Sequence, residues 1–300
     1  MTASFMGLKP SENPLIAGGR APRSIVIGTG SIKEQTVQQK IRRVAAAQWI
    51  RTLAAAVISH ALVVAPSLFA GPPFRTDDPE PPEYQHWEIY VASQYANDKY
   101  GASGSAPQIE LNYGAMPDVQ VSLTFPPTFD KPREGATLYG PGDVQPGVKY
   151  RFMQEGDYRP MAALYPLLNL PTGDRNRGLG NGSPQLFLPV WLQKSWGPWT
   201  SYGGGGYWLN PGTDNKNYWY VGWLIQRDIT KWLTFGGEIF YQTPPTLYGA
   251  YETGYNLGAI INFTENHHFT FSAGSDIRGP NLFSFYAAYL LTWGPPERNK

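Results

Sequence analysis

The chain has 300 residues, of which 42% are apolar, 14% aromatic and only 16% charged, and it contains no cysteine. The lack of cysteine excludes a disulfide framework and a thiolate metal site. The 33 glycines and 28 prolines predict many turns and few long helices. The net charge of +1 is unevenly divided, because residues 1–70 hold eight basic and two acidic residues, whereas residues 71–300 hold 16 basic and 21 acidic ones. A basic head is typical of a targeting sequence.

The basic head ends in an apolar run. Residues 40–70 begin with Lys40, Arg42 and Arg43 and continue into a mostly apolar stretch that ends at Ala70. This stretch is short for a membrane span, which needs about 20 apolar residues. It therefore predicts a signal peptide cleaved after Ala70, with a transmembrane anchor as the alternative. Residues 1–39 show little periodicity, and we expect them to be disordered or an over-extended start.

A proline-rich segment, GPPFRTDDPEPPEYQ, follows at residues 71–85. It holds four acidic residues, and a cluster of this kind could hold a cation. Prolines separate these residues, however, and proline favours extended or turn conformations. We expect an extended, solvated periplasmic lead; its acidic residues are Asp77, Asp78, Glu80 and Glu83.

From residue 86 onward the sequence alternates between apolar and polar residues with a period of two, which predicts β-strands. Near the C-terminus, Phe269 and Phe271 fall on one face of such a strand, while Thr270 and Ser272 fall on the other. Twelve segments show the pattern: 86–96, 106–115, 119–129, 144–153, 159–170, 184–194, 198–209, 217–227, 232–242, 254–264, 268–276 and 282–293.

The connections between these segments alternate between mostly longer loops, rich in glycine, proline and charge, and tight turns. An even number of strands of about ten residues, with long loops at one end and short turns at the other, is typical of an outer-membrane β-barrel. We therefore predict an all-β fold, a transmembrane antiparallel β-barrel of about 12 strands over residues 86–294, with periplasmic termini and a polar tail at 295–300. A soluble β-sandwich is the alternative, but its exposed face should carry many lysines and glutamates.

Tryptophans near the predicted strand ends suggest two aromatic belts at the membrane interfaces. Gly203 to Gly206 falls within one strand, where glycine marks a bend or a close approach by another segment. This run of glycines predicts room for bulky lumen groups or a plugging loop. The expected belt residues are Trp87, Trp196, Trp199, Trp232 and Trp293 at the short-turn end, and Trp208 and Trp219 at the other end.

Residues 71–294 resemble the outer-membrane transporters of the phenol-degradation meta-pathway (MetA-pathway) family. The resemblance implies a barrel in the bacterial outer membrane that moves small, often apolar or aromatic compounds. Two features depart from the family's pattern. One is the N-terminal extension, and the other is the presence of residues after Trp293, because barrel assembly favours a terminal aromatic residue. The matching words are GPPFRTDDPEPPEYQHWEIY (71–90), GPGDVQPGVKYRF (140–152), YPLLNLPTGD (165–174) and NYWYVGWLIQRDITKWLTFGGEIFY (217–241).

The histidines offer little for catalysis. After residue 70 there are only His86, His267 and His268, at the start of a predicted strand and in a predicted tight turn. A lipase-like serine–histidine pair should lie near the outer leaflet, which is not where these histidines are predicted to lie. The His267–His268 pair also lacks partners at metal-ligand spacing. We therefore expect no enzyme activity, no catalytic residue, no metal and no cofactor.

Extending the alternation places several charged residues on the inward face, where they avoid the cost of about 2–4 kcal/mol for a basic residue facing lipid near the membrane midplane. They could crosslink the barrel, form a selective constriction, or do both. Twelve strands predict a narrow or partly plugged lumen. We expect passage of small molecules, with a structural or surface-binding barrel as the alternative. The expected partners are outer-membrane lipid, the barrel-assembly machinery and a small molecule of unknown identity, and not nucleic acid. The predicted pore-lining residues are Glu88, Glu110, Lys149, Arg151, Glu238 and Asp276.

Overall fold

A computed structural model of the chain describes residues 73–295. The predictions for residues 1–39, the signal peptide at 40–70 and most of the polar tail fall outside the described residues. Within residues 73–295, no helix is both long and apolar enough to cross a membrane. The helical content of this part is a single 3₁₀ turn, η1, at Arg175–Arg177.

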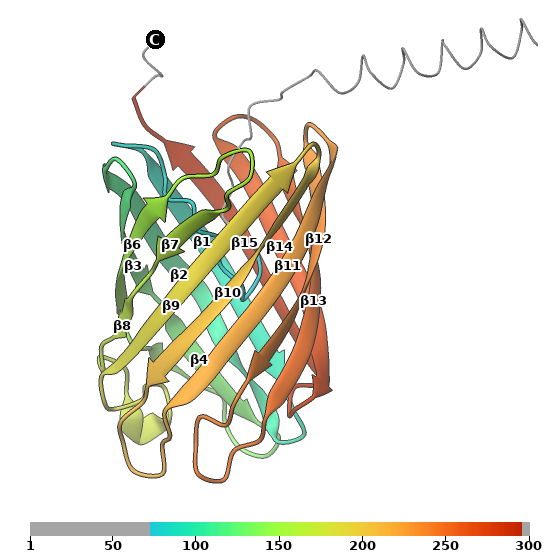
Figure 1. Cartoon of the computed structure of the whole chain (residues 1–300). Helices are drawn as coiled ribbons and strands as arrows, with labels where there is room; N and C mark the ends of the chain where they lie inside the picture. Colours follow the sequence, from blue (N-terminus) through green and yellow to red (C-terminus); the bar gives the residue numbers. More distant parts are fainter. Residues whose placement is uncertain (1–72, 296–300) are drawn as a thin grey trace, which may run out of the picture. The chain divides into compact units, whose positions relative to one another are not determined.

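The described residues form one antiparallel sheet (Figure 1). Its strands are β1 (Trp87–Asn97), β2 (Gly101–Met116), β3 (Val119–Phe125), β4 (Pro127–Pro132), β5 (Leu138–Pro141), β6 (Gln145–Met153), β7 (Met161–Leu164), β8 (Leu167–Asn169), β9 (Gln185–Trp196), β10 (Trp199–Leu209), β11 (Tyr218–Thr230), β12 (Leu233–Gln242), β13 (Glu252–Asn262), β14 (His267–Arg278) and β15 (Phe283–Trp293).

The sheet closes into a barrel because β1 pairs with both β2 and β15. The β4 strand continues β3 along β2, β5 precedes β6 and pairs with β4, and β7 and β8 both lie between β6 and β9. The 15 segments therefore make 12 strands around the barrel, which confirms the predicted fold and strand number. Closure pairs the first strand with the last, so the long strands have partners on both sides, as a sheet in lipid requires. Among the described strands, β5, in the hairpin at the loop end, pairs on one side only.

Short turns gather at one end of the barrel and longer loops at the other. The first and last strands pair from Trp87 with Trp293 through to Asn97 with Phe283, so both ends of the barrel sequence lie at the short-turn end. Two predicted loops are shorter than expected, because β2 already begins at Gly101 and the β4–β5 hairpin extends the sheet.

The two faces of each strand differ as the period of two predicts. In β11, Trp219, Val221 and Trp223 are each about half exposed on the outer face, whereas Tyr220 and Leu224 are buried on the inner face. Large apolar side chains therefore cover the outside of the barrel, as the hydrocarbon of a membrane would require.

Candidate functional site

The proline-rich residues 73–83, named here the lumen segment, lie inside the barrel. The segment appears in Figure 1 as a cyan loop enclosed by the strands. Thr76 is fully buried, and so are Pro73 and Pro79. The expectation of a solvated lead is therefore wrong for this part of the chain. Three of its four acidic residues, Asp77, Asp78 and Glu80, meet inward-facing cations, and such pairing compensates for the loss of water around buried charges.

A carboxylate in β12 holds one side of the lumen segment. Glu238 is 4% exposed and accepts hydrogen bonds from the backbone N–H groups of Arg75 and Thr76, both at 2.9 Å. The side-chain amide of Asn256 in β13 donates a third bond to Glu238 at 2.6 Å. The Glu238 carboxylate thus receives three donors, two of them from a segment more than 160 residues away in sequence.

Arg75 extends the same contact toward the loop end. Its guanidinium forms an ion pair with Glu252 at the start of β13, and it lies 4.2 Å from the ring centroid of Phe240 and 5.5 Å from that of Tyr220. A cation over an aromatic face within about 6 Å gains electrostatic attraction. Arg75 is therefore held by one carboxylate and two rings of the barrel wall.

Glycines in the wall leave space for the segment. A Cβ atom at Gly222 in β11 would overlap the side chain of Thr76, and one at Gly258 in β13 would lie 3.0 Å from the ring of Phe74. The hydroxyl of Ser272 in β14 donates a hydrogen bond to the carbonyl of Pro73. The inner surface of β11 to β14 is therefore shaped to receive this part of the chain.

The opposite wall binds the acidic part of the segment. Lys149 in β6 lies 3.1 Å from Asp77 and 3.6 Å from Asp78, and its side chain is 5% exposed. Two strand positions further on, Arg151 lies 3.5 Å from Glu80. Because Glu238 and Lys149 lie on different walls, residues 75–80 cross the lumen from β12 to β6.

Arg151 also joins the segment to a turn of the barrel. Its guanidinium lies 2.7 Å from the carboxylate of Asp118 in the β2–β3 turn. Burial, together with the nearby Asp78, raises the pKa of Glu80 to about 7, although Arg151 and Lys149 act in the opposite direction. Burial also raises the pKa of Asp78, and Lys149 offsets part of that effect.

The other predicted pore-lining residues have different surroundings. Glu88 in β1 accepts a bond from the Tyr90 hydroxyl at 3.3 Å, and Glu110 in β2 accepts one from Asn112 at 3.1 Å. Neither carboxylate forms an ion pair within residues 73–295. Asp276 instead accepts the backbone N–H of Asn281 at 2.9 Å and thereby shapes the β14–β15 loop. The six predicted residues thus divide into three that hold the lumen segment, a carboxylate pair on β1 and β2, and a loop residue.

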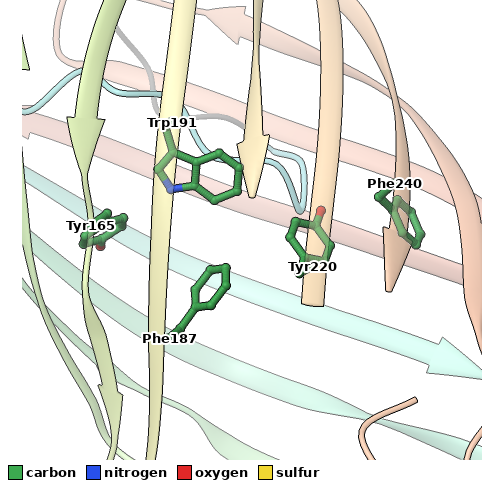
Figure 2. Close-up of a cluster of buried hydrophobic side chains, with 5 residues drawn as sticks. All are labelled: Tyr165, Phe187, Trp191, Tyr220 and Phe240. Carbon is green, nitrogen blue, oxygen red and sulfur yellow. The ribbon is translucent and has the colours of Figure 1, made fainter. Parts of the chain in front are cut away.

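Sequence reasoning missed an aromatic cluster inside the barrel. Figure 2 shows its five side chains projecting from neighbouring strands into the lumen. The ring centroids of Phe187 and Trp191 are 6.5 Å apart, and Tyr220 lies 6.4 Å from each of them. Both faces of β9 and β11 are apolar, and this pattern in the sequence was the signal that aromatic side chains also point into the lumen. The cluster, named here the aromatic wall, consists of Tyr165, Phe187, Trp191, Tyr220 and Phe240, with Leu167 and Trp208 packed against it.

The prediction that Trp208 belongs to an aromatic belt is wrong. Its ring stacks on Phe187 at 4.7 Å, inside the barrel, whereas the adjacent Tyr207 packs on Trp219 at 4.8 Å on the outer face. Successive residues of a strand point to opposite faces, so Tyr207 and Trp208 cannot both face lipid. Among the other expected belt residues, the exposed ones are Trp196, Trp219, Trp232 and Trp293, and the partly buried ones are Trp87 and Trp199.

The four glycines of β10 are explained by close approaches of the strands on both sides. A Cβ atom at Gly203 would clash with the ring of Trp223, and one at Gly204 would lie 3.1 Å from the ring of Trp191. Trp223 covers the outer face and donates a hydrogen bond from its ring N–H to Ser201 at 2.9 Å. The close approach predicted for this run of glycines therefore comes from the Trp223 ring at Gly203 and from the backbones of β9 and β11 at Gly204, Gly205 and Gly206.

A family model described as "Putative MetA-pathway of phenol degradation" matches residues 87–291, more than half of the chain. The fold is similar to that of the COG4313 outer membrane channel from Pseudomonas putida F1, with a TM-score of 0.59 and 13% identity, over 71% of this chain and 97% of that one. The NanC porin matches with a TM-score of 0.48 and 11% identity, over 68% and 98% of the two chains. No curated protein matches the sequence.

Proposed function

Because the chain belongs to the MetA-pathway of phenol degradation family and folds as a closed twelve-stranded barrel, we propose that it lets small molecules pass across the bacterial outer membrane. The observation that carries this proposal is a lumen that holds both charged and aromatic side chains. The Pseudomonas putida protein with a similar fold is described as an outer membrane channel, which supports the same class of function.

The contents of the lumen restrict what can pass. The lumen segment crosses between β12 and β6 and reduces the open cross-section. The aromatic wall places the rings of Phe187, Trp191 and Tyr220 inside the barrel, where each is at most 6% exposed and becomes accessible only if its neighbours in the lumen move. Rings of this kind attract apolar and aromatic molecules. Small aromatic compounds, which the family resemblance also implies, are therefore the substrates that we propose.

The outer face supports a place in lipid. Exposed apolar side chains such as Trp223, Ile239 and Leu257 cover the middle of their strands, where a soluble barrel would carry charges. We propose that this face meets outer-membrane lipid and that the barrel-assembly machinery inserts it. We also propose that the protein acts as a channel and not as an enzyme, with no cofactor.

The experiment that tests this function is planar-bilayer conductance of refolded residues 71–300. Discrete current steps, small in size because the lumen segment narrows the path, would support a channel. Absence of current, from protein that is β-rich by circular dichroism and shows heat-modifiable gel mobility, would contradict an open channel while leaving the barrel in place. A soluble monomer that needs no detergent would contradict the membrane location.

A barrel that does not transport is the second candidate, and the ion pairs of the lumen segment favour it. Lys149 and Arg151 form contacts with Asp77, Asp78 and Glu80 that could hold the lumen closed permanently. Removing the lumen segment distinguishes the two functions. If the barrel is a channel, the native protein conducts and removal of the segment increases its conductance; if the barrel is only structural, the native protein does not conduct and current appears only after the segment is removed.

A further inference from the structure

A cavity of about 730 Å³ opens at the long-loop end of the lumen. This volume falls within the range of roughly 300–1,000 Å³ that is usual for small-molecule sites. The aromatic wall does not contribute to it. Its lining includes Gln94 of β1, Gln108 of β2 and Asp130 of β4 on one side, and Asp143, Asn169 and Leu179 on the opposite side.

The β8–β9 loop folds into the barrel mouth and forms one side of the cavity. Asp143 accepts hydrogen bonds from the backbone N–H groups of Gly173 at 2.9 Å and Asn181 at 2.7 Å. Leu179, between these two anchor points, is only 3% exposed. Because the half-buried carboxylate of Asp143 binds the loop at two points eight residues apart, this side of the cavity is preorganised.

The facing side presents a hydrogen-bond donor that the protein does not use. Gln108 is 7% exposed, and its Oε1 accepts bonds from the amide of Gln94 at 3.1 Å and the hydroxyl of Ser105 at 3.0 Å. Within residues 73–295 its Nε2 group donates to no protein atom. The Nε2 atom itself is not fully buried, so it opens onto the cavity, where water or a ligand oxygen can accept its hydrogen bond.

Acceptors and further amides surround this donor. Asp130 lines the cavity and forms no ion pair with another described residue. Asn169, on the opposite side, is held in place because it donates to Gln185 at 2.8 Å and accepts from Gln145 at 3.3 Å. The cavity thus combines fixed donors and acceptors on two facing walls.

Apolar surface is scarce in this cavity. The ring of Phe129 lies 6.4 Å from Tyr95, which stacks on the exposed Phe285 at 5.4 Å, so the Phe129 ring faces outward. Leu179 is then the main large apolar side chain on the lining. The cavity therefore offers little ring surface on which an aromatic ligand could stack. A ligand with several hydroxyl groups can instead both donate hydrogen bonds to the walls and accept hydrogen bonds from them.

We propose that this cavity binds an uncharged molecule with several hydroxyl groups, about the size of a monosaccharide. The proposal goes beyond the proposed function, because this ligand differs from the small aromatic compounds proposed to pass through the lumen. It rests on the proposed function only in that a channel open at the loop end would let such a molecule reach the cavity. Gln108 would donate to a ligand oxygen, and Asp130 would accept from a ligand hydroxyl.

The test is a titration of the detergent-solubilised protein with D-glucose, followed by saturation-transfer NMR, with phenol as the comparison compound. The Gln108→Glu variant keeps the oxygen that accepts from Gln94 and Ser105 and removes the N–H donor. The Asp130→Ala variant removes the carboxylate that would accept from the ligand, at a position less buried than Gln108. The matched control is Gln242→Glu, which adds the same charge at the loop end outside the cavity and keeps an acceptor for Arg75. Heat-modifiable gel mobility checks that each variant folds.

We expect saturable glucose binding that weakens about tenfold in Gln108→Glu and in Asp130→Ala but not in the control. A loss of one hydrogen bond to a buried group is consistent with this size of effect. Absence of saturable glucose binding, equal weakening in the control, or phenol binding with glucose excluded would each overturn the proposal. Swelling of liposomes in glycerol, measured in parallel, separates the two proposals: swelling without glucose binding contradicts only this site, and glucose binding without swelling contradicts passage.

Discussion

Lys149 in β6 and Asp77 in the lumen segment form an ion pair of 3.1 Å in the interior of the barrel. The Lys149 side chain is almost fully enclosed, with 5% of its surface exposed. A buried charge that loses its partner is strongly destabilised, by roughly 3–5 kcal/mol. If the segment moves away, Lys149 loses its carboxylate partners, and water must then enter the lumen to solvate its charge. The position of the lumen segment and the hydration of the lumen are linked through this contact.

Removing the two cations of β6 should loosen the lumen segment. In the double variant Lys149→Ala with Arg151→Ala, the carboxylates of the segment lose their partners on this wall, and we expect larger single-channel conductance and faster entry of small molecules into liposomes. The matched control is Arg227→Ala with Lys231→Ala, which removes two exposed cations outside the lumen. Equal conductance in both double variants would contradict a role for the β6 cations in holding the segment.

A disulfide should lock the lumen segment in place. The chain has no cysteine, so an introduced pair cannot form mixed bonds with native thiols. A Cβ atom built at Gly222 lies 3.2 Å from the Cβ atom of Thr76, slightly below the usual range of about 3.5–4.5 Å for a disulfide. We expect Thr76→Cys with Gly222→Cys to crosslink under oxidising conditions and to lower conductance, and reduction to restore it. The single cysteine variants should not respond to the redox conditions. If the oxidised double variant conducts as the reduced one does, passage requires no movement of the segment at this contact.

The period of two in the sequence was sufficient to predict the barrel, since each strand of β9 to β15 falls within a few residues of its predicted range. The same pattern carries no information about a segment that forms no strand. The position of residues 73–83 depends on contacts such as Glu238 with Thr76, which join residues far apart in the chain. The inward placement of Lys149 and Glu238 was predicted from the cost of charge in lipid, but their partner was not. Likewise, the inward Trp208 could be recognised only from its contact with Phe187.

Conductance should increase with pH because of Glu80. Burial and the neighbouring Asp78 raise the pKa of Glu80 to about 7, against the opposing effects of Arg151 and Lys149. A carboxyl whose pKa is raised in the docked state favours docking when protonated, so docking is strongest below the ordinary pKa of 4.5 and weakens as the pH rises through about 7. We expect higher conductance at pH 8.5 than at pH 5.5, and a smaller difference in Glu80→Gln. The control is Glu134→Gln in an exposed loop. An unchanged pH response in Glu80→Gln would assign the effect to another group.

The two ends of the barrel should differ in their access from outside the cell. Tyr248 in the β12–β13 loop and Tyr158 in the β6–β7 turn are both highly exposed, and they lie at opposite ends of the barrel. In whole cells, we expect a membrane-impermeant maleimide to label Tyr248→Cys at once, and Tyr158→Cys only after the outer membrane is permeabilised, because long loops face outward in outer-membrane barrels. The unmodified chain, which has no cysteine, provides the background. Immediate labelling of Tyr158→Cys with protection of Tyr248→Cys would reverse the orientation, and the cavity at the loop end would then face the periplasm. Equal labelling of both sites in intact cells would contradict a membrane-spanning barrel.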